Sequence, residues 1–159
     1  DWFSDVLNRK LNLVTMPETT HRAADHRYAP EGQIVSFADG FPFLLIGQSS
    51  LEDMNSRLAI PLPMNRFRPN LVFVGGEAFD EDRWKDFQIG EIWFRGVKPC
   101  ARCVVTTIDQ DSAARSAEPL RTLATFRQQG HKILFGQNLI WMGEGEPVVR
   151  VGMELGIAE

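Results

Sequence analysis

Two cysteines, Cys100 and Cys103, carry the most chemically versatile side chains of this sequence. They are the chain's only cysteines and lie three residues apart, with Arg102 directly before Cys103 and Lys98 two residues before Cys100. Neighbouring cations favour the thiolate form of cysteine, and a thiolate is both a nucleophile and a soft metal ligand. Cys103 is therefore a candidate nucleophile or metal ligand.

Two common uses of a cysteine pair do not suit this context. A structural zinc site needs four ligands, whereas the chain has no second cysteine pair and its three histidines, His21, His26 and His131, are not spaced to complete one. A thiol–disulfide oxidoreductase places its pair at the start of a helix, whereas the β-branched run in residues 104–108 predicts a strand after Cys103. Buried, unreactive cysteines remain the alternative to a functional Cys103.

The basic residues around the cysteines belong to two windows that contain no acid. Residues 61–76 carry Arg66 and Arg68, and residues 92–107 carry three further cations, although the chain as a whole has a net charge of −4. Two such windows could converge on one anionic ligand, since the arginine fork suits phosphate. The alternative is that these arginines form ordinary surface ion pairs with the six acids of residues 77–91.

The bulk composition excludes several classes of protein. With 159 residues, 43% of them hydrophobic, the chain can form one globular domain with a core. Its acidic balance argues against a nucleic-acid partner, and no apolar run approaches the roughly 20 residues of a membrane span. Two cysteines do not make a disulfide scaffold, so a reducing cytoplasm is the expected location.

The elements that must position the cysteines are mostly short strands. Helices are predicted over residues 1–11, 50–58 and 119–128. Strands are predicted over residues 11–16, 33–37, 43–46, 70–74 and 104–108, with a hairpin over 87–94 that turns at Gly90 and three or four short strands within 132–157. Many strands with few helices indicate a mainly β, α+β fold: a closed or barrel-like sheet with helices packed outside.

Seven segments of the chain, in their order and spacing, resemble the MOSC domain, the C-terminal domain of molybdenum-cofactor sulfurases. The closest subgroup comprises bacterial YcbX-type proteins and the mitochondrial amidoxime-reducing component. The segments span residues 67–70, 81–84, 89–90, 99–107, 118–123, 135–138 and 151–152. We interpret the whole chain, 1–159, as a single MOSC domain, with a matched core over 35–157 and a lead-in segment over 1–34.

The resemblance implies a MOSC-type β-barrel with a few peripheral helices, and a molybdenum ion held by a pterin dithiolene and one protein thiolate. Carried over, the metal ligand and catalytic residue is Cys103, with Cys100 as its neighbour. The same carry-over places cofactor contacts at Arg68 and Arg102, which face the pterin and its phosphate, and at Asp39, Gly40, Ala101 and Asn138.

The resemblance also implies a reaction and its partners. The expected reaction is the two-electron reduction of an N–OH bond to an amine and water in a small N-hydroxylated substrate. The expected electron donor is ferredoxin-like or a flavoprotein reductase, in a bacterial cytoplasm, with no nucleic acid or membrane as partner. The cofactor is molybdenum-molybdopterin, and pyridoxal phosphate is not expected to bind. A non-catalytic molybdenum-cofactor or sulfur-carrier module is the alternative.

The lead-in segment departs from the family pattern. Members of the subgroup carry an N-terminal β domain with a His-Pro-Val-Lys-Ser-like segment that also contacts the cofactor, and residues 1–34 contain nothing similar. We therefore expect the chain to be the MOSC domain of a longer protein.

Overall fold

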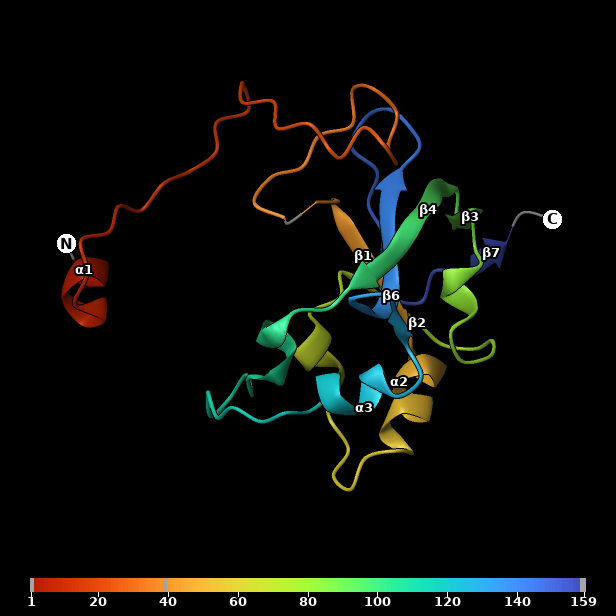
Figure 1. Ribbon diagram of the computed structural model, residues 1–159. Coiled ribbons are helices and arrows are strands. Elements are labelled where there is room, and N and C mark those ends of the chain that lie inside the picture. Colours follow the sequence, from red (N-terminus) through yellow and green to blue (C-terminus); the bar gives the residue numbers. More distant parts are fainter. Residues whose placement is uncertain (1, 39, 158–159) are drawn as a thin grey trace.

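A computed structural model describes residues 2–38 and 40–157 of the chain (Figure 1). Its helices are α1 (Trp2–Leu7), α2 (Gln48–Asn55) and α3 (Leu120–Ala124), and its 3-10 helices are η1 (Met64–Phe67), η2 (Asp80–Asp82) and η3 (Val104–Thr107). Its strands are β1 (Phe43–Gly47), β2 (Leu71–Phe73), β3 (Asp86–Ile89), β4 (Ile92–Ala101), β5 (Gln128–Gln129), β6 (Lys132–Trp141) and β7 (Leu155–Ile157).

The strands form one curved sheet in the order β2-β1-β6-β4-β3-β7, with β5 paired to β6. Its pairs are antiparallel except that of β1 with β2, which is parallel. The ladder between β4 and β6 is irregular between Gly96 and Lys98 and again between Pro99 and Ala101, and such irregularities bend a strand. The sheet curls into a nearly closed barrel with helices outside it, which confirms the predicted mainly β class.

Several predicted elements are confirmed. The strands β1 and β2 lie where short apolar runs predicted them, and the hairpin of β3 and β4 turns after Ile89 as predicted. The helices α2 and α3 form within or beside the predicted ranges but are shorter. Ser50 does not cap α2, which begins two residues earlier; its hydroxyl instead donates to Glu81 Oε2 at 2.8 Å inside the protein.

The predicted strand at residues 104–108 is wrong, because the chain forms the 3-10 helix η3 there. Two side chains explain the difference. The hydroxyl of Thr106 donates to the carbonyl of Cys103 at 3.0 Å, and that of Thr107 donates to the carbonyl of Val104 at 2.7 Å. Such local side-chain bonds offer the backbone an alternative to a sheet ladder.

The predictions at the two ends of the chain were also partly wrong. Residues 132–157 form one long strand, β6, and the short β7 rather than three or four short strands. Gly136 lies inside β6 with φ 79°, where an added Cβ would stand 2.7 Å from Ile46 Cγ1. Residues 11–16 pair with no strand of the described chain, and residues 33–37 contribute only the bridge between Ile34 and Ala23.

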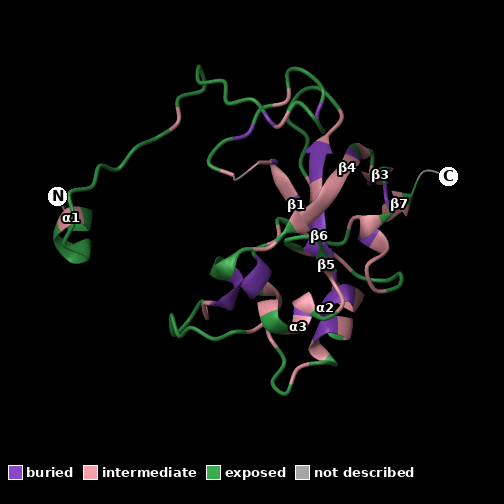
Figure 2. Cartoon of the chain, viewed as in Figure 1, coloured by how far each residue is buried: buried purple, intermediate pink, exposed green. Residues whose placement is uncertain are grey.

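The buried residues form three apolar clusters, visible as the purple regions along β6, β1 and α2 in Figure 2. The first joins the helices to one end of the sheet: Leu44, Ile46, Leu51, Met54, Phe67, Leu123 and Phe135. The second fills the barrel: Leu45, Trp84, Phe87, Ile89, Phe94 and Leu139. The third lies under the segment before β1: Ala24, Ala29, Val35, Phe41 and Ile140. None of the described helices has the length and apolar character needed to cross a membrane.

Candidate cofactor-binding surface

The cysteines lie where β4 ends and η3 begins. Both are free thiols: Cys103 is exposed, and Cys100 is half-buried against the first cluster. The backbone N–H of Arg102 between them donates to the carbonyl of Ile133 at 2.8 Å, which keeps the end of β4 beside β6. The exposure of Cys103 removes the interpretation of this residue as a buried, inert cysteine.

The guanidinium of Arg102 points to the neighbouring loop rather than to Cys103. It donates from Nη2 to the carbonyl of Phe67 at 2.6 Å and from Nη1 to the sulfur of Cys100 at 3.1 Å. The cation that precedes Cys103 in sequence therefore contacts the other thiol. The third nitrogen, Nε, is buried without a hydrogen-bond partner among the described residues. A buried N–H group without a hydrogen bond destabilises the folded state unless another acceptor, such as a ligand, bonds to it.

Arg68 follows Phe67 directly, so the bond from Arg102 to the Phe67 carbonyl brings the two arginines together. Arg68 has left-handed backbone geometry, with φ 53°, as the residue that ends η1. Its side chain is exposed and forms no hydrogen bond or ion pair with any described residue. It therefore remains available to an anion, and the surface ion-pair alternative does not apply to it.

The other basic residues of the two windows are already paired. Arg95 bonds Asp86 of the neighbouring strand through two hydrogen bonds, at 2.6 and 2.9 Å. Lys98 lies 3.9 Å from Asp25, and its ammonium stands 4.2 Å from the ring centre of Tyr28. Hydrogen bonds from Arg27, aided by nearby cations, outweigh partial desolvation and lower the pKa of Asp25 to about 2. The predicted ion pair with an acid of residues 77–91 is therefore correct for Arg95, whereas Lys98 pairs with Asp25, outside that range.

Arg66 holds η3 from the opposite side. It is buried, with 3% of its surface exposed, and donates to the carbonyls of Thr106 at 3.1 Å and Thr107 at 3.5 Å. It also forms an ion pair with Asp109 at 3.0 Å. Arg66 thus reaches from η1 to η3, while Arg102 reaches from η3's start back to η1. We call these two arginines the arginine clamp, because together they fix the loop that carries Cys103.

Two of the remaining predicted contacts lie on the paired strands β4 and β6. Ala101 pairs with Leu134 of β6, and Asn138, four residues further along β6, pairs with Lys98 and donates from Nδ2 to the Lys98 carbonyl at 3.2 Å. Four residues of strand span about 13 Å, so a ligand that touches both ends must be elongated.

Gly40 lies just before Phe41, whose ring centre is 5.0 Å from the Lys98 ammonium. A Cβ added at Gly40 would meet no atom within 4 Å, so the surface beside its backbone is open. Asp39 lies outside the described residues. The structure thus places Arg102 and Cys103 where β4 ends and bonds the Arg102 side chain to the residue before Arg68, with Asn138 further along the same strands.

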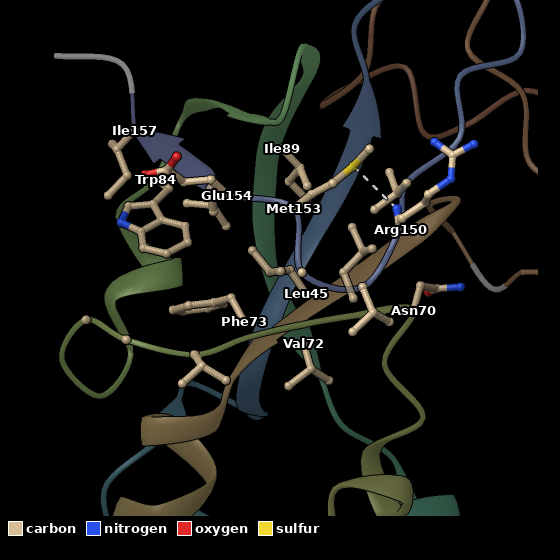
Figure 3. Close-up of a pocket in the computed structure, with 18 of the residues that line it drawn as sticks. Leu45, Asn70, Val72, Phe73, Trp84, Ile89, Arg150, Met153, Glu154 and Ile157 are labelled. Carbon is tan, nitrogen blue, oxygen red and sulfur yellow. Dashed lines mark hydrogen bonds between the residues drawn. The ribbon is translucent and has the colours of Figure 1, made fainter.

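The cavities of the described chain lie elsewhere. One of about 810 Å³ and one of about 390 Å³ open between β2 and the segment that leads to β7, and no predicted site residue lines either. Figure 3 shows Leu45, Phe73, Trp84 and Met153 around the larger one. Cys103 therefore lies on an open surface of the described chain rather than in one of these hollows.

Sequence reasoning assigned no role to Arg66 or to the Phe67 carbonyl, although both contribute to the arrangement. The basic window around Arg66 was a signal for that residue. The target of its side chain, 40 residues further along, was not predictable from local spacing.

Comparison with known sequences finds a matching family and several relatives. Residues 32–155 match the profile of the family described as MOSC domain. The chain is 37% identical to mitochondrial amidoxime-reducing component 1 of Homo sapiens, over 86% of this chain and 42% of that protein. It is 34% identical to molybdenum cofactor sulfurase of Oryza sativa subsp. japonica, over 98% of this chain and 21% of that protein. The chain thus spans less than half the length of these relatives.

Proposed function

The chain belongs to the MOSC domain family, and from this premise we propose that it is the molybdenum-cofactor-binding domain of a reductase of N-hydroxylated compounds. The observations that carry the proposal are the exposed thiol of Cys103, the unpaired side chain of Arg68 and the buried, unpartnered Nε of Arg102, on segments that pack against one another. A thiolate ligand beside arginine donors suits a soft metal carried by an anionic, phosphate-bearing group.

The residues on this surface fit such a group. Cys103 would supply the sulfur ligand, and Arg68 and Arg102 Nε would donate to the phosphate and the pterin. Ala101, Asn138, Gly40 and Asp39 would contact the rest of the cofactor along the sheet. When bound, the molybdenum centre supplies the two-electron redox chemistry, and the protein supplies binding, orientation and electrostatics.

The arginine clamp gives this surface its rigidity. Thr106 N–H donates to the Cys103 carbonyl at 3.2 Å, and Arg66 in turn holds the Thr106 carbonyl. Arg102, the residue directly before Cys103, is anchored by its own side chain to the Phe67 carbonyl. The backbone is therefore held on both sides of the thiol. Preorganised ligands of this kind lose less freedom on binding.

The substrate and the electron donor complete the proposal. The net reaction converts an N–OH group, two electrons and two protons into an amine and water. We propose a small N-hydroxylated substrate, such as a hydroxylamine or an amidoxime, and a ferredoxin-like protein or a flavoprotein reductase as donor. The name of the human relative, amidoxime-reducing component, supports this substrate class.

Metal analysis tests the ligand assignment. The chain is purified from cells that make molybdenum cofactor, and molybdenum and pterin are measured per chain for the wild type, Cys103→Ala and the matched control Cys100→Ala. We expect the wild type and the control to retain molybdenum and the Cys103 variant to lose it at least tenfold. A wild-type chain without molybdenum, or full retention after Cys103→Ala, contradicts the proposal.

A second function is a non-catalytic module that binds cofactor or carries sulfur. The similarity to a protein named molybdenum cofactor sulfurase favours it as the alternative. The two are separated by supplying the loaded protein with chemically reduced ferredoxin and benzamidoxime and measuring formation of the amidine, benzamidine. Turnover that disappears in Cys103→Ala supports the reductase, and cofactor binding without turnover supports the alternative.

A further inference from the structure

The barrel is open along one side, between β2 and the segment Val149–Ile157 that ends in β7. We call this opening the seam. It contains the cavity of about 810 Å³, which is lined mainly by apolar side chains of these two segments and, at its base, by Leu45, Trp84 and Ile89. Several large apolar residues at its rim are exposed, with Val74 at 87%. The seam is therefore an apolar cleft on an otherwise closed barrel.

Both walls of the seam are strand edges. Within the described chain, β2 pairs only with β1, and β7 pairs only with β3, so each strand has one edge free of ladder partners. Free strand edges accept an added strand through main-chain hydrogen bonds. An apolar cleft between two such edges has the shape and the bonding groups for one more extended segment.

The chain itself carries a segment of that kind. Residues 11–16 read Leu-Asn-Leu-Val-Thr-Met, and their pattern predicts a strand. In the structure they are extended, and the backbone groups of 12–16 have no hydrogen-bond partner among the described residues. Leu13 is 84% exposed and Val14 66%. Figures 1 and 2 show this segment, with α1 before it, standing away from the barrel as a largely exposed arm.

One carboxylate of the seam, that of Glu154, is complementary to the cations before the segment, while Arg150 also lines the seam. Arg9 and Lys10 precede the segment directly and are exposed. Glu154 lines the seam, and its carboxylate forms no hydrogen bond or ion pair with a described residue. A segment seated with its first residues near Glu154 would place cations beside this free carboxylate.

We propose that residues 11–16 of one copy of the chain add as a strand in the seam of a second copy. The arm of each copy stands clear of its own barrel, and each copy offers both the segment and the seam. Reciprocal exchange therefore forms a closed, two-fold dimer, the symmetry most common among homo-oligomers. The exchange buries the exposed apolar residues of the arm and pairs the free edges of both seams. It is independent of the cofactor.

The test is the oligomeric state of two matched pairs of variants, measured by light scattering over a range of concentrations. Leu13→Asp damages the segment and Val74→Asp the rim of the seam. The controls are Thr19→Asp, on the same arm, and Ile60→Asp, an exposed apolar residue in another loop. We expect the wild type to be a dimer. Its dissociation constant should rise at least tenfold in Leu13→Asp and in Val74→Asp, and it should not change in the two controls.

A mixing experiment identifies the contact. Leu13→Asp keeps an intact seam, and Val74→Asp keeps an intact segment. In a mixture, the segment of the Val74→Asp chain can therefore fill the seam of the Leu13→Asp chain. Neither variant alone has both an intact segment and an intact seam, so neither alone can form this dimer. A monomeric wild type, a dimer insensitive to both variants, or a mixture that stays monomeric overturns the proposal. A monomer whose thermal midpoint falls in Leu13→Asp also overturns it, because the segment would then occupy its own seam.

Discussion

At the scale of single residues, the structure assigns different partners to side chains that look alike in the sequence. Arg102 donates hydrogen bonds to Cys100 and to the Phe67 carbonyl. Arg66 is buried and forms an ion pair with Asp109, whereas Arg68 is unpaired among the described residues. Only the last can be removed without breaking a contact of the folded chain. Arg68 is therefore the residue at which binding of an anion can be separated from stability.

We expect Arg68→Ala to lower cofactor content at least tenfold while the free energy of unfolding changes by less than about 0.5 kcal/mol, as for most surface substitutions. Arg68→Lys should recover only part of the loss, because lysine keeps the charge but not the planar fork. Molybdenum analysis and thermal unfolding measure the two effects. Arg121→Ala, an exposed arginine on α3, is the control. A large loss of stability in Arg68→Ala would contradict the assignment.

Glu81 predicts a dependence of stability on pH. It has no exposed surface and accepts hydrogen bonds from the Gly47 N–H at 3.1 Å and the Ser50 hydroxyl at 2.8 Å. Burial raises its pKa above the ordinary value of 4.5, and the hydrogen bonds oppose this shift only in part. The folded state therefore binds the proton more tightly than the unfolded state, and stability falls as the pH rises from 4.5 through the raised pKa.

Urea unfolding of the wild type and Glu81→Gln over this pH range measures the effect. The free energy of unfolding of the wild type should fall as the pH rises. Glu81→Gln should lack the part of this fall that is due to the ionisation of Glu81. Glu91→Gln, at an exposed carboxylate in the turn of the hairpin, is the control and should behave like the wild type. An unchanged pH dependence in Glu81→Gln would contradict the prediction.

At the scale of elements, the loop that carries Cys103 depends on its neighbours more than on its own propensity. The 3-10 helix η3 has one turn and takes its position from η1, through Arg66, and from the end of β4, through Arg102. Because short helical turns are marginal alone, the arginine clamp determines where the thiol lies.

Arg66→Met should lower the free energy of unfolding by about 2 to 3 kcal/mol, because it removes charged hydrogen bonds to two buried carbonyls. It should also change the alkylation rate of Cys103 under native conditions more than that of Cys100. Arg95→Met removes a comparable pair with Asp86 in the hairpin of β3 and β4, but that pair is half-exposed and should cost less than about 1 kcal/mol. Equal effects of both variants on Cys103 would show that the clamp has no special role.

At the scale of the whole molecule, two of the three apolar clusters, here the first and the second core, support different parts of the structure. Phe135 belongs to the cluster beneath the candidate site, where its ring centre lies 4.4 Å from that of Phe67. Leu139 lies four residues further along β6, inside the barrel. Both are fully buried. The first core therefore supports the arginine clamp, and the second closes the barrel toward the seam.

Phe135→Ala and Leu139→Ala should each cost about 3 kcal/mol, since both leave a cavity in a packed core. Only Phe135→Ala should also alter the alkylation rate of Cys103, because Phe67, whose carbonyl holds Arg102, rests on that ring. Chemical unfolding and native thiol labelling of the two variants provide the comparison. A similar change of labelling in Leu139→Ala would indicate that the two cores act as one.

Features that depend on a local pattern could be predicted from the amino-acid sequence. Short apolar runs bounded by turn residues predicted β1 and β2, and the turn at Gly90 predicted the hairpin, because these signals are local in sequence. The ordered motifs identified the family and pointed to Cys103 and Arg68, whose accessibility the structure confirms. Their roles toward the cofactor remain predictions.

Only the tertiary structure decided which groups meet across long stretches of chain. It showed that residues 104–107 form a 3-10 helix, that Arg102 contacts Cys100, and that Arg66 reaches Thr106. It also left the barrel open between β2 and β7 and the arm without a strand partner among the described residues. These contacts depend on packing between elements far apart in sequence, and local spacing carries no information about which partner a long side chain or a free strand edge will find.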